Sequence, residues 1–586
     1  MNILKNEYPR PQFERSAWLN LNGTWQFEID NSMVGQEKEF YKRNTLSGKI
    51  NVPFCPESAF SGVGNKDFIN CVWYKRDFDI PKEHTSKRVI LHFGAIDYHA
   101  YVYVNEKKVG EHVGGYTPFS FDITDFLKET DNNIVVCAED DTRSGNQPLG
   151  KQSDRLKSYG CLYTRTTGIW QTVWLEFVDE CYIESVKITT EINLPSVNVE
   201  FKMSECFDNV NVTAEAFWDG NSVGKASVDL KSDLSFVNLK LDEKHLWEVG
   251  KGNLYDLKLT VKRDGVVCDE VLSYFGLRTV CLDGRSFKIN GKTVFGRWVL
   301  DQGFYPNGIY TAPSDDDLKN DILNSQKLGF NGARLHEKVF EPRFLYWADK
   351  LGYIVWGEFA NRGLDITETG QISHFLPEWI EAMKRDINHP SIIGWCPFNE
   401  TWDYKGRKQS DMIIKMVYEV TKEIDQSRPV IDTSGNFHVE TDIFDVHDYE
   451  QNPTEFSSHY EKLTDGIAED TCYLYLDPLT RDRQKYDGIS PVFVSEYGGI
   501  QWPGSGSDGW GYGVAPKSEA EFLERYRGLT EALINNPYML GFCYTQLYDV
   551  EQEINGLMTY DRKFKFDPEI IKKINSKKAA IEIKDE

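Results

Sequence analysis

The sequence has little basic charge relative to its acidic charge. Its 586 residues include 66 Lys and Arg against 91 Asp and Glu, which gives a formal net charge of −25 at pH 7. A protein that binds nucleic acid or an anionic membrane surface needs a basic face that neutralises phosphates. No such face can be recognised, so we expect no nucleic-acid and no membrane partner. The substrate should be neutral, or an anion held by a few local cations.

Long apolar runs and metal-binding spacings are also lacking. No stretch reaches the roughly 18 apolar residues of a membrane-spanning helix, and the first residues lack the basic and apolar regions of a signal peptide. The 11 cysteines are an odd number without CxxC spacing, and no His-x-x-x-His or EF-hand pattern occurs. We therefore expect a cytoplasmic protein that requires no metal and no cofactor.

Short strand-like runs fill the first half of the chain. Residues 1–180 hold alternating or β-branched runs such as Gly23–Ile29 and Arg88–Phe93, with no helical period, which predicts a β-sandwich. Residues 181–278 hold further period-two runs, such as Ser185–Thr190 and Leu257–Val261. About 100 residues with some seven short strands is the size of an immunoglobulin-like sandwich.

From residue 279 to residue 586 the pattern changes to alternating strands and amphipathic helices. Eight such units in about 300 residues predict a (β/α)₈ barrel. The candidate strands are Val294–Val299, Gly332–His336, Ile354–Glu358, Ile392–Pro397, Pro429–Thr433, Phe444–Asp448, Val492–Ser495 and Leu540–Thr545.

Two glutamates, Glu400 and Glu496, end the apolar runs of the fourth and seventh predicted strands. Desolvating a carboxylate is costly unless it is paired, so this placement indicates chemistry. The strand ends of such a barrel form one mouth, where a rigidly held carboxyl pair about 5–5.5 Å apart can perform retaining glycoside hydrolysis. Other polar residues predicted at this mouth are Arg334, His336, Glu358, Asn399, His447, Tyr449, Tyr497 and Tyr544.

The motifs around these glutamates resemble those of glycoside hydrolase family 2. Asn399-Glu400 and Ser495-Glu496-Tyr497-Gly498 are similar to its acid/base and nucleophile signatures. Further similar motifs lie in all three predicted domains, including Gly168-Ile-Trp170 and Asn388-His-Pro-Ser391. The resemblance implies an N-terminal jelly-roll, an immunoglobulin-like domain and a catalytic barrel, with a terminal β-linked sugar as substrate. Members are often dimers or tetramers, so a homo-oligomer is allowed.

The resemblance also implies roles for individual residues. Glu496 would be the nucleophile, and Glu400 the acid/base, with a pKa raised towards neutrality in the free enzyme. Asn399 would bond the sugar 2-hydroxyl, Arg334 would hold the nucleophile ionised, and Tyr449 or Tyr497 would donate to it. His336, His447 and Trp502 are candidates for lining the sugar subsite.

The sugar itself is less determined by the motifs. β-Glucuronidases of the family carry an Asn-x-Lys pair where this chain has Asn555-Gly-Leu557, which favours galacto-configured sugars. Arg362 stands where compact β-galactosidase-like members have tryptophan, and its guanidinium could bind a uronic carboxylate, giving a β-galacturonidase. The alternatives are a β-glucuronidase of the same family and an inactive carbohydrate-binding protein.

Three loops bear on how the substrate reaches the site. Exo action is expected because the segments Asp465–Ser490 and Gln501–Gly513 have the size to wall one end of the mouth. The segment Gly150–Tyr163 of the first domain is a candidate to reach the active site from outside the barrel.

Overall fold

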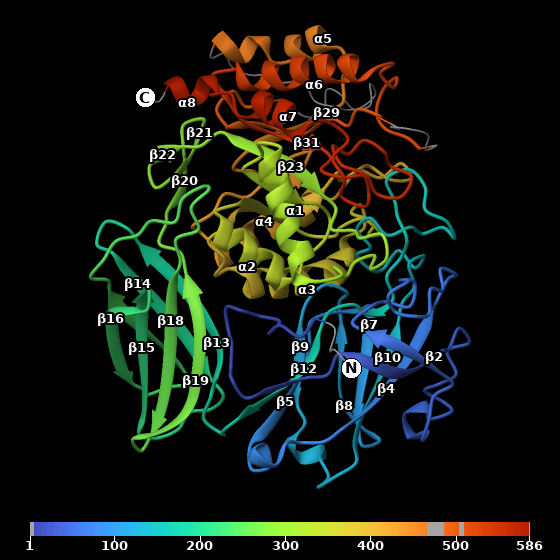
Figure 1. The fold of residues 1–586 in the computed structure, drawn as a ribbon, viewed down its shortest axis with the longest axis vertical. Coiled ribbons are helices and arrows are strands. Elements are labelled where there is room, and N and C mark those ends of the chain that lie inside the picture. The colour runs from blue at the N-terminus through green and yellow to red at the C-terminus, as the bar shows by residue number, and fades with distance from the viewer. Residues whose placement is uncertain (1–4, 466–485, 503–508, 585–586) are drawn as a thin grey trace.

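The computed structural model describes residues 5–465, 486–502 and 509–584 and has three domains. Figure 1 shows the barrel above two β-sandwiches that lie side by side. This confirms the predicted combination of jelly-roll, immunoglobulin-like sandwich and (β/α)₈ barrel.

The first domain packs a four-stranded sheet, in the order β1-β12-β5-β9, against a six-stranded sheet, in the order β3-β2-β4-β10-β7-β8. Inward residues such as Trp25, Tyr74, Leu91 and Val136 fill the space between them, as the alternation predicts. The strands are β1 (Trp18–Asn20), β2 (Gly23–Ile29), β3 (Gly48–Val52), β4 (Cys71–Phe78), β5 (Arg88–Phe93), β6 (Ile96–Asp97), β7 (His99–Val104), β8 (Lys107–Val113), β9 (Phe119–Asp122), β10 (Asn132–Glu139), β11 (Gly168–Ile169) and β12 (Val173–Val178).

The second domain has seven strands in two antiparallel sheets, ordered β13-β14-β17 and β16-β15-β18-β19. A short three-stranded sheet, β20-β21-β22, follows it and leads into the barrel. The strands are β13 (Ile183–Glu191), β14 (Ser196–Met203), β15 (Val210–Trp218), β16 (Asn221–Asp229), β17 (Leu234–Lys240), β18 (Tyr255–Arg263), β19 (Val266–Phe275), β20 (Val280–Asp283), β21 (Ser286–Ile289) and β22 (Lys292–Thr293).

The barrel contains a parallel sheet in the order β26-β25-β24-β23-β31-β30-β29. The predicted fifth strand is reduced to a bridge between Trp395 and Val430 and to the pairing of β27 with β28, which lies between β26 and β29. The strands are β23 (Gly296–Asp301), β24 (Gly332–Leu335), β25 (Ile354–Glu358), β26 (Ile392–Cys396), β27 (Phe398–Asn399), β28 (Thr433–Ser434), β29 (Phe444–Asp448), β30 (Val492–Gly498) and β31 (Met539–Thr545).

The barrel helices begin where the sequence offers a cap. The side chain of Ser314 accepts from the backbone N–H of Asp317 at the start of α1, and Ser518 caps α6 in the same way. Gly352 ends α2 with a left-handed φ of 63°, which glycine adopts without strain. The helices are α1 (Asp315–Lys327), α2 (Pro342–Leu351), α3 (Ile372–Asp386), α4 (Asp411–Ile424), α5 (Pro453–Ser458), α6 (Glu519–Ile534), α7 (Pro568–Asn575) and α8 (Ala580–Lys584).

Large aromatic residues fill the barrel interior below the mouth. Trp298 lies edge-on to Trp356 and to Phe493, with ring centroids 6.1 and 4.8 Å apart. This packed layer gives the polar residues above it a rigid floor.

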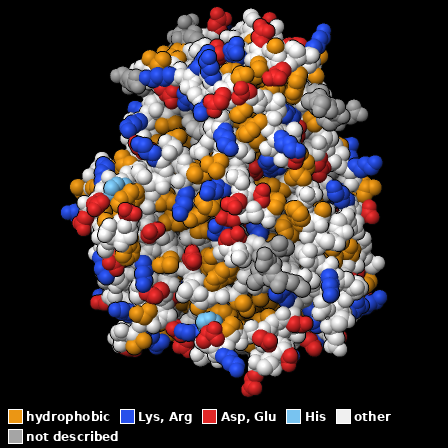
Figure 2. Space-filling model, viewed as in Figure 1, with side chains coloured by type: hydrophobic (Ala, Val, Ile, Leu, Met, Phe, Trp, Pro, Cys, Tyr) orange, Lys and Arg blue, Asp and Glu red, His pale blue; other side chains and the backbone are white. Residues whose placement is uncertain are grey.

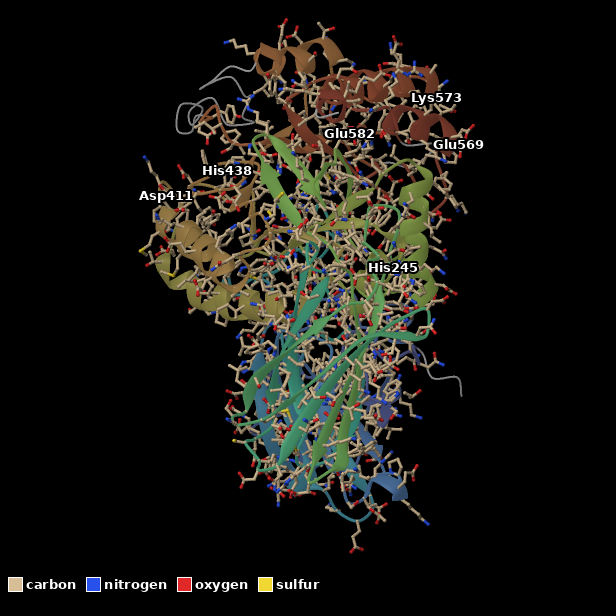
Figure 3. The ribbon with its side chains drawn as sticks, turned by 90° about the vertical axis from the view of Figure 1, so that its left-hand side faces the viewer. His245, Asp411, His438, Glu569, Lys573 and Glu582 are labelled. Atoms are coloured by element: carbon tan, nitrogen blue, oxygen red, sulfur yellow. The ribbon has the colours of Figure 1, made fainter. Side chains whose placement is uncertain are left out.

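Near the end of the chain, Glu582 of α8 accepts a hydrogen bond from Arg297 of β23 at 2.9 Å, which ties α8 to the first barrel strand (Figure 3).

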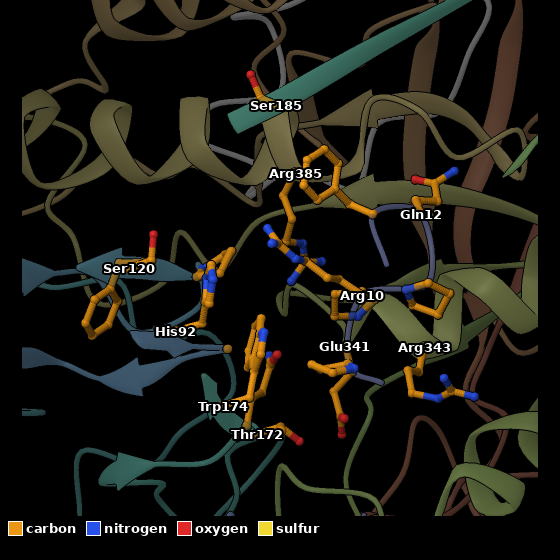
Figure 4. A pocket seen from close by; sticks show the side chains of 18 of the residues that line it. Arg10, Gln12, His92, Ser120, Thr172, Trp174, Ser185, Glu341, Arg343 and Arg385 are labelled. Carbon is orange, nitrogen blue, oxygen red and sulfur yellow. The ribbon is translucent and has the colours of Figure 1, made fainter. Parts of the chain in front are cut away.

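The first domain docks on barrel helix α3. Glu378 accepts a hydrogen bond from the backbone N–H of Tyr116 at 2.6 Å, and Glu381 contacts Thr117 and His112. A cavity of about 340 Å³ lies where the N-terminal segment meets both sandwiches and the end of α3, between Arg10, His92 and Arg385 (Figure 4). This cavity is separate from the barrel mouth.

The surface carries charges of both signs. On the face shown in Figure 2, Lys and Arg side chains are interspersed with Asp and Glu, so the acidic excess does not form one single block there. Among the described residues, no helix combines the length and the apolar character needed to cross a bilayer.

Candidate active site

Glu400 and Glu496 lie opposite each other at the mouth of the barrel. Glu400 directly follows β27, and Glu496 lies near the end of β30. Their nearest carboxyl oxygens, together with a ring nitrogen of His447, all lie within 4.8 Å of one another. This separation fits a retaining pair, because inverting enzymes need about 6.5–9.5 Å to admit a water.

Glu496 is held by three side chains. Arg334 Nη1 donates to Oε1 at 3.2 Å, and the Tyr449 hydroxyl donates to Oε2 at 2.5 Å. His447 Nδ1 lies 3.4 Å from Oε2. These contacts fix the orientation of the carboxylate that would act as the nucleophile.

Arg334 connects several residues of the site through hydrogen bonds. Buried at 1% exposure, it donates to Glu358 at 2.5 Å, to the Ser495 carbonyl at 2.8 Å and to Asn399 Oδ1 at 3.2 Å, besides Glu496. A guanidinium with this many acceptors is rigidly oriented, so it fixes the nucleophile relative to Asn399. Asn399 is also anchored through its backbone, which exchanges two hydrogen bonds with the Asn361 side chain.

The contacts of His447 favour its protonated form. Ser434 Oγ donates to Asp445 at 2.6 Å, so it accepts from His447 Nε2 at 3.0 Å. On the other side of the ring, Nδ1 faces Glu400 at 2.8 Å. A protonated ring can donate to both partners, and the pKa of His447 is raised because the carboxylates of Glu496 and Glu400 outweigh its burial.

The same contact determines the state of Glu400. Burial alone would raise its pKa, but the hydrogen bond from His447 and the charges of His447 and Lys151 lower it below its usual value. The family resemblance implies a raised pKa for Glu400 in the free enzyme, whereas the contacts seen here lower it. The proton is held by the Glu400–His447 pair and lies mainly on the histidine. Glu400 also has a φ of 49°, a left-handed conformation that costs energy outside glycine.

His336 is neutral, in contrast to His447. Its Nδ1 faces Glu358 at 3.2 Å, and its Nε2 lies 3.9 Å from Glu496. Burial, together with the positive charges of Lys151 and Arg334, holds its pKa well below the usual value. The two histidines predicted at the mouth are thus both present there, in different charge states.

Three residues predicted at the site lie elsewhere. The pairing of β30 shifts register between Val494 and Tyr497, and this irregularity turns Glu496 inwards and Tyr497 outwards, where its hydroxyl lies 2.8 Å from Thr530 of α6. Tyr544 also faces outwards, against Tyr497 and Tyr526. Trp502 packs on Phe522 and Phe566 in the outer layer, so it is a packing residue.

Arg362 is used for a contact between domains. Its Nη1 donates to the Gln152 carbonyl at 2.9 Å, and its own carbonyl accepts from the Leu149 N–H at 2.6 Å. One donor of the guanidinium is thus used in a hydrogen bond to the first domain. Of the segments expected to wall the mouth, residues 466–485 and 503–508 lie outside the described residues.

Several residues of the site were not found from the sequence. Lys151 and Cys161 reach it from the first domain, and the charge of Lys151 acts on both Glu400 and Glu496. Tyr512 stacks on Tyr449 with ring centroids 3.4 Å apart. Gly435 leaves room for His447, because a Cβ there would lie 2.5 Å from Nδ1. Lys151 and Cys161 belong to the segment Gly150–Tyr163, which the sequence offered as a candidate to reach the site, but no local pattern singles out any of these four residues.

Family models match all three domains. The model for "Glycosyl hydrolases family 2, sugar binding domain" matches residues 49–146, "Glycosyl hydrolases family 2" matches residues 181–278, and "Glycosyl hydrolases family 2, TIM barrel domain" matches residues 311–577. Together they cover most of the chain.

Individual relatives carry two different names. The chain is 27% identical over 513 residues to a β-galactosidase of Thermoanaerobacterium thermosulfurigenes, covering 83% of this chain and 65% of that protein. It is 25% identical over 540 residues to a β-glucuronidase of Felis catus, covering 84% and 79%. Among solved structures, the β-glucuronidase of Ruminococcus gnavus superposes with a TM-score of 0.79 at 19% identity, covering 98% and 99%, which shows a shared fold.

Proposed function

The chain belongs to glycoside hydrolase family 2, whose members hydrolyse O-glycosyl bonds, and from that premise we propose that it is a retaining exo-β-glycosidase acting on terminal β-linked sugars. The observation that carries the proposal is the carboxyl pair of Glu400 and Glu496, whose nearest oxygens lie within 4.8 Å at the barrel mouth.

In the first step, Glu496 attacks the anomeric carbon while the bond to the aglycone oxygen breaks. Glu400 gives that oxygen the proton of the Glu400–His447 pair, whose atoms are 2.8 Å apart. Asn399 Oδ1, fixed by Arg334 at 3.2 Å, is placed beside the nucleophile to accept from the sugar 2-hydroxyl. The result is a covalent glycosyl-enzyme.

In the second step, a water attacks the same carbon and Glu400 takes its proton. Glu496 is esterified at this stage and carries no negative charge. As the ester bond breaks, Arg334 and Tyr449 stabilise the departing carboxylate through their hydrogen bonds. Two inversions at one carbon give net retention of configuration.

For the sugar, we propose a galacto-configured terminal residue, with or without a carboxylate at C6. The chain lacks a lysine at the Asn555-Gly-Leu557 position, which weakens the case for a β-glucuronide. Because Arg362 donates to the Gln152 carbonyl, we propose that it positions the segment around Lys151 and does not contact the sugar directly.

A β-glucuronide is the second candidate. It is supported by the names of similar proteins and of solved structures of similar fold, several of which are β-glucuronidases. Each of these names describes that protein, and the identities of 19–25% leave the sugar open.

Hydrolysis of 4-nitrophenyl β-galactoside, β-galacturonide, β-glucuronide and β-glucoside tests both candidates. We expect release from one of the galacto-configured substrates to be fastest, with single sugars as the only products of an oligosaccharide. Preference for the glucuronide would move the assignment to the second candidate. No turnover of any of the four would contradict the proposed function.

A further inference from the structure

Lys151 lies on a segment of the first domain that packs against the rim of the barrel. Figure 1 shows this part of the chain rising from the sandwich along the barrel. Arg362 binds the Gln152 carbonyl from one side, and Thr164 donates to Glu551 from the other. Next to Lys151, Gly150 approaches so closely that a Cβ there would lie 2.3 Å from the Glu337 carbonyl oxygen.

The Lys151 side chain is buried, and its ammonium has no protein acceptor among the described residues. The residue is 9% exposed, and within the described part of the chain its Nζ makes neither a hydrogen bond nor an ion pair. Buried ammonium groups are normally paired, because desolvating a charge is costly. The guanidinium of Arg334, in comparison, donates hydrogen bonds to the side chains of Glu358, Glu496 and Asn399 and to the Ser495 carbonyl.

The backbone next to Lys151 lies against the barrel mouth, because Gly150 meets the carbonyl of Glu337, the residue that follows His336. The nearby carboxyl groups of Glu337, Glu400 and Glu496 help to raise the pKa of Lys151 in spite of its burial. Glu337, also buried, has a pKa raised to about 7 by burial, so it is a weak competitor for the cation near neutral pH. Lys151 therefore brings a positive charge to the rim of the mouth, where it interacts electrostatically with Glu400 and Glu496 and has no hydrogen-bond acceptor among the described residues.

We propose that Lys151 binds the C6 carboxylate of a terminal hexuronic acid, so that the N-terminal sandwich completes the sugar subsite and sets its specificity. A carboxylate forms a charge-assisted hydrogen bond with an ammonium, and it would supply the acceptor that the described residues do not give Lys151. This inference rests on the proposed function and names the substrate class of the same site.

The test compares a 4-nitrophenyl β-hexuronide, glucuronide or galacturonide, with its C6 primary amide, which removes the charge. Wild type should prefer the acid. In Lys151→Met the acid-to-amide ratio of kcat/KM should fall roughly 10- to 100-fold, the value of a charge-assisted hydrogen bond. Lys151→Arg should retain part of the ratio. Lys157→Met, an exposed lysine of the same segment, should leave it unchanged.

Each outcome has a definite meaning. An unchanged ratio in a folded Lys151→Met variant, with both substrates slowed equally and the pH profile displaced, would assign Lys151 to tuning of the glutamates and overturn the inference. Wild type that cleaves galactoside but neither hexuronide would also overturn it, while the proposed function would stand. Absence of any glycosidase activity would remove both.

Discussion

Single side chains divide the proposed chemistry between them. Arg334 and Tyr449 fix the nucleophile, and His447 holds the proton of the acid/base pair. The two glutamates could be predicted from the sequence, because each ends an apolar run at the barrel mouth, and Arg334 could be predicted from its place near the end of the second predicted strand. For Lys151 only its segment, Gly150–Tyr163, could be named as a candidate to reach the site, since the residue comes close to the glutamates only through the docking of two domains.

Replacing Glu400 by alanine tests its role as general acid. We expect kcat/KM for a phenyl glycoside to fall by roughly 10²–10⁴, the usual contribution of such a group. A 2,4-dinitrophenyl glycoside should lose much less in its first step, because that leaving group needs no proton. Steady-state and burst kinetics on both substrates provide the measurement. An equal loss on the two substrates would contradict the role.

Replacing His447 by asparagine tests where the proton resides. In the wild type the basic limb of the kcat/KM profile should report the proton of the pair, which is lost at the raised pKa of His447. Without the imidazolium, Glu400 carries the proton alone, so we expect the basic limb to move to lower pH. A limb that stays in place would show that the pair does not share the catalytic proton.

At the scale of elements, strand ends and one loop position the site. The alternation of buried residues predicts the strands well, but it fails at β30, where the register shift turns Glu496 inwards and Tyr497 outwards. Such irregularities depend on pairing with neighbouring strands, so the sequence of one strand does not reveal them. The fifth predicted strand is reduced for a similar reason, since its residues pair only briefly with β26 and β27.

Two glycines of the segment around Lys151 provide a matched test of its docking. Gly150 and Gly160 have φ values of 57° and 52°, but a Cβ would clash only at Gly150, with the Glu337 carbonyl. Alanine should cost both positions about the same backbone strain of roughly 1–2 kcal/mol. We expect Gly150→Ala to lower kcat/KM at least tenfold, with Gly160→Ala close to wild type. Equal effects would show that the docking of this segment does not matter for activity.

At the scale of the whole molecule, the sandwiches serve the barrel. The three-domain order could be predicted from the change in pattern along the chain, whereas the contacts between domains could not. Glu378 of α3 is an example, because it is buried against the backbone of Tyr116 only when the first domain is docked. Burial there raises the pKa of Glu378 to about 8.

This carboxyl should make stability depend on pH. In the unfolded chain it ionises near pH 4.3, while in the fold it keeps its proton to about pH 8, so its contribution to stability falls as pH rises between these values. Glu378→Gln cannot ionise and keeps an acceptor. We expect its Tm relative to wild type to rise by roughly 1–3 °C between pH 5 and pH 8.

Glu381→Gln is the control on the same helix. The hydrogen bonds from His112 and Thr117 outweigh burial and lower the pKa of Glu381, so its contribution has the opposite sign and is lost as pH falls through the lowered pKa. A Tm difference for Glu378→Gln that stays constant from pH 5 to pH 8 would contradict this account of the docked interface.

The central claim is that Glu496 forms a covalent bond to the sugar while Glu400 serves as acid/base. Incubation with an activated 2-fluoro glycoside of the preferred sugar, followed by digestion and mass spectrometry, tests it most directly. We predict one fluoroglycosyl group per chain, on the peptide that contains Glu496, and restored activity when the intermediate turns over. A label on another residue, or full activity with no label and an inverted first product, would contradict the account.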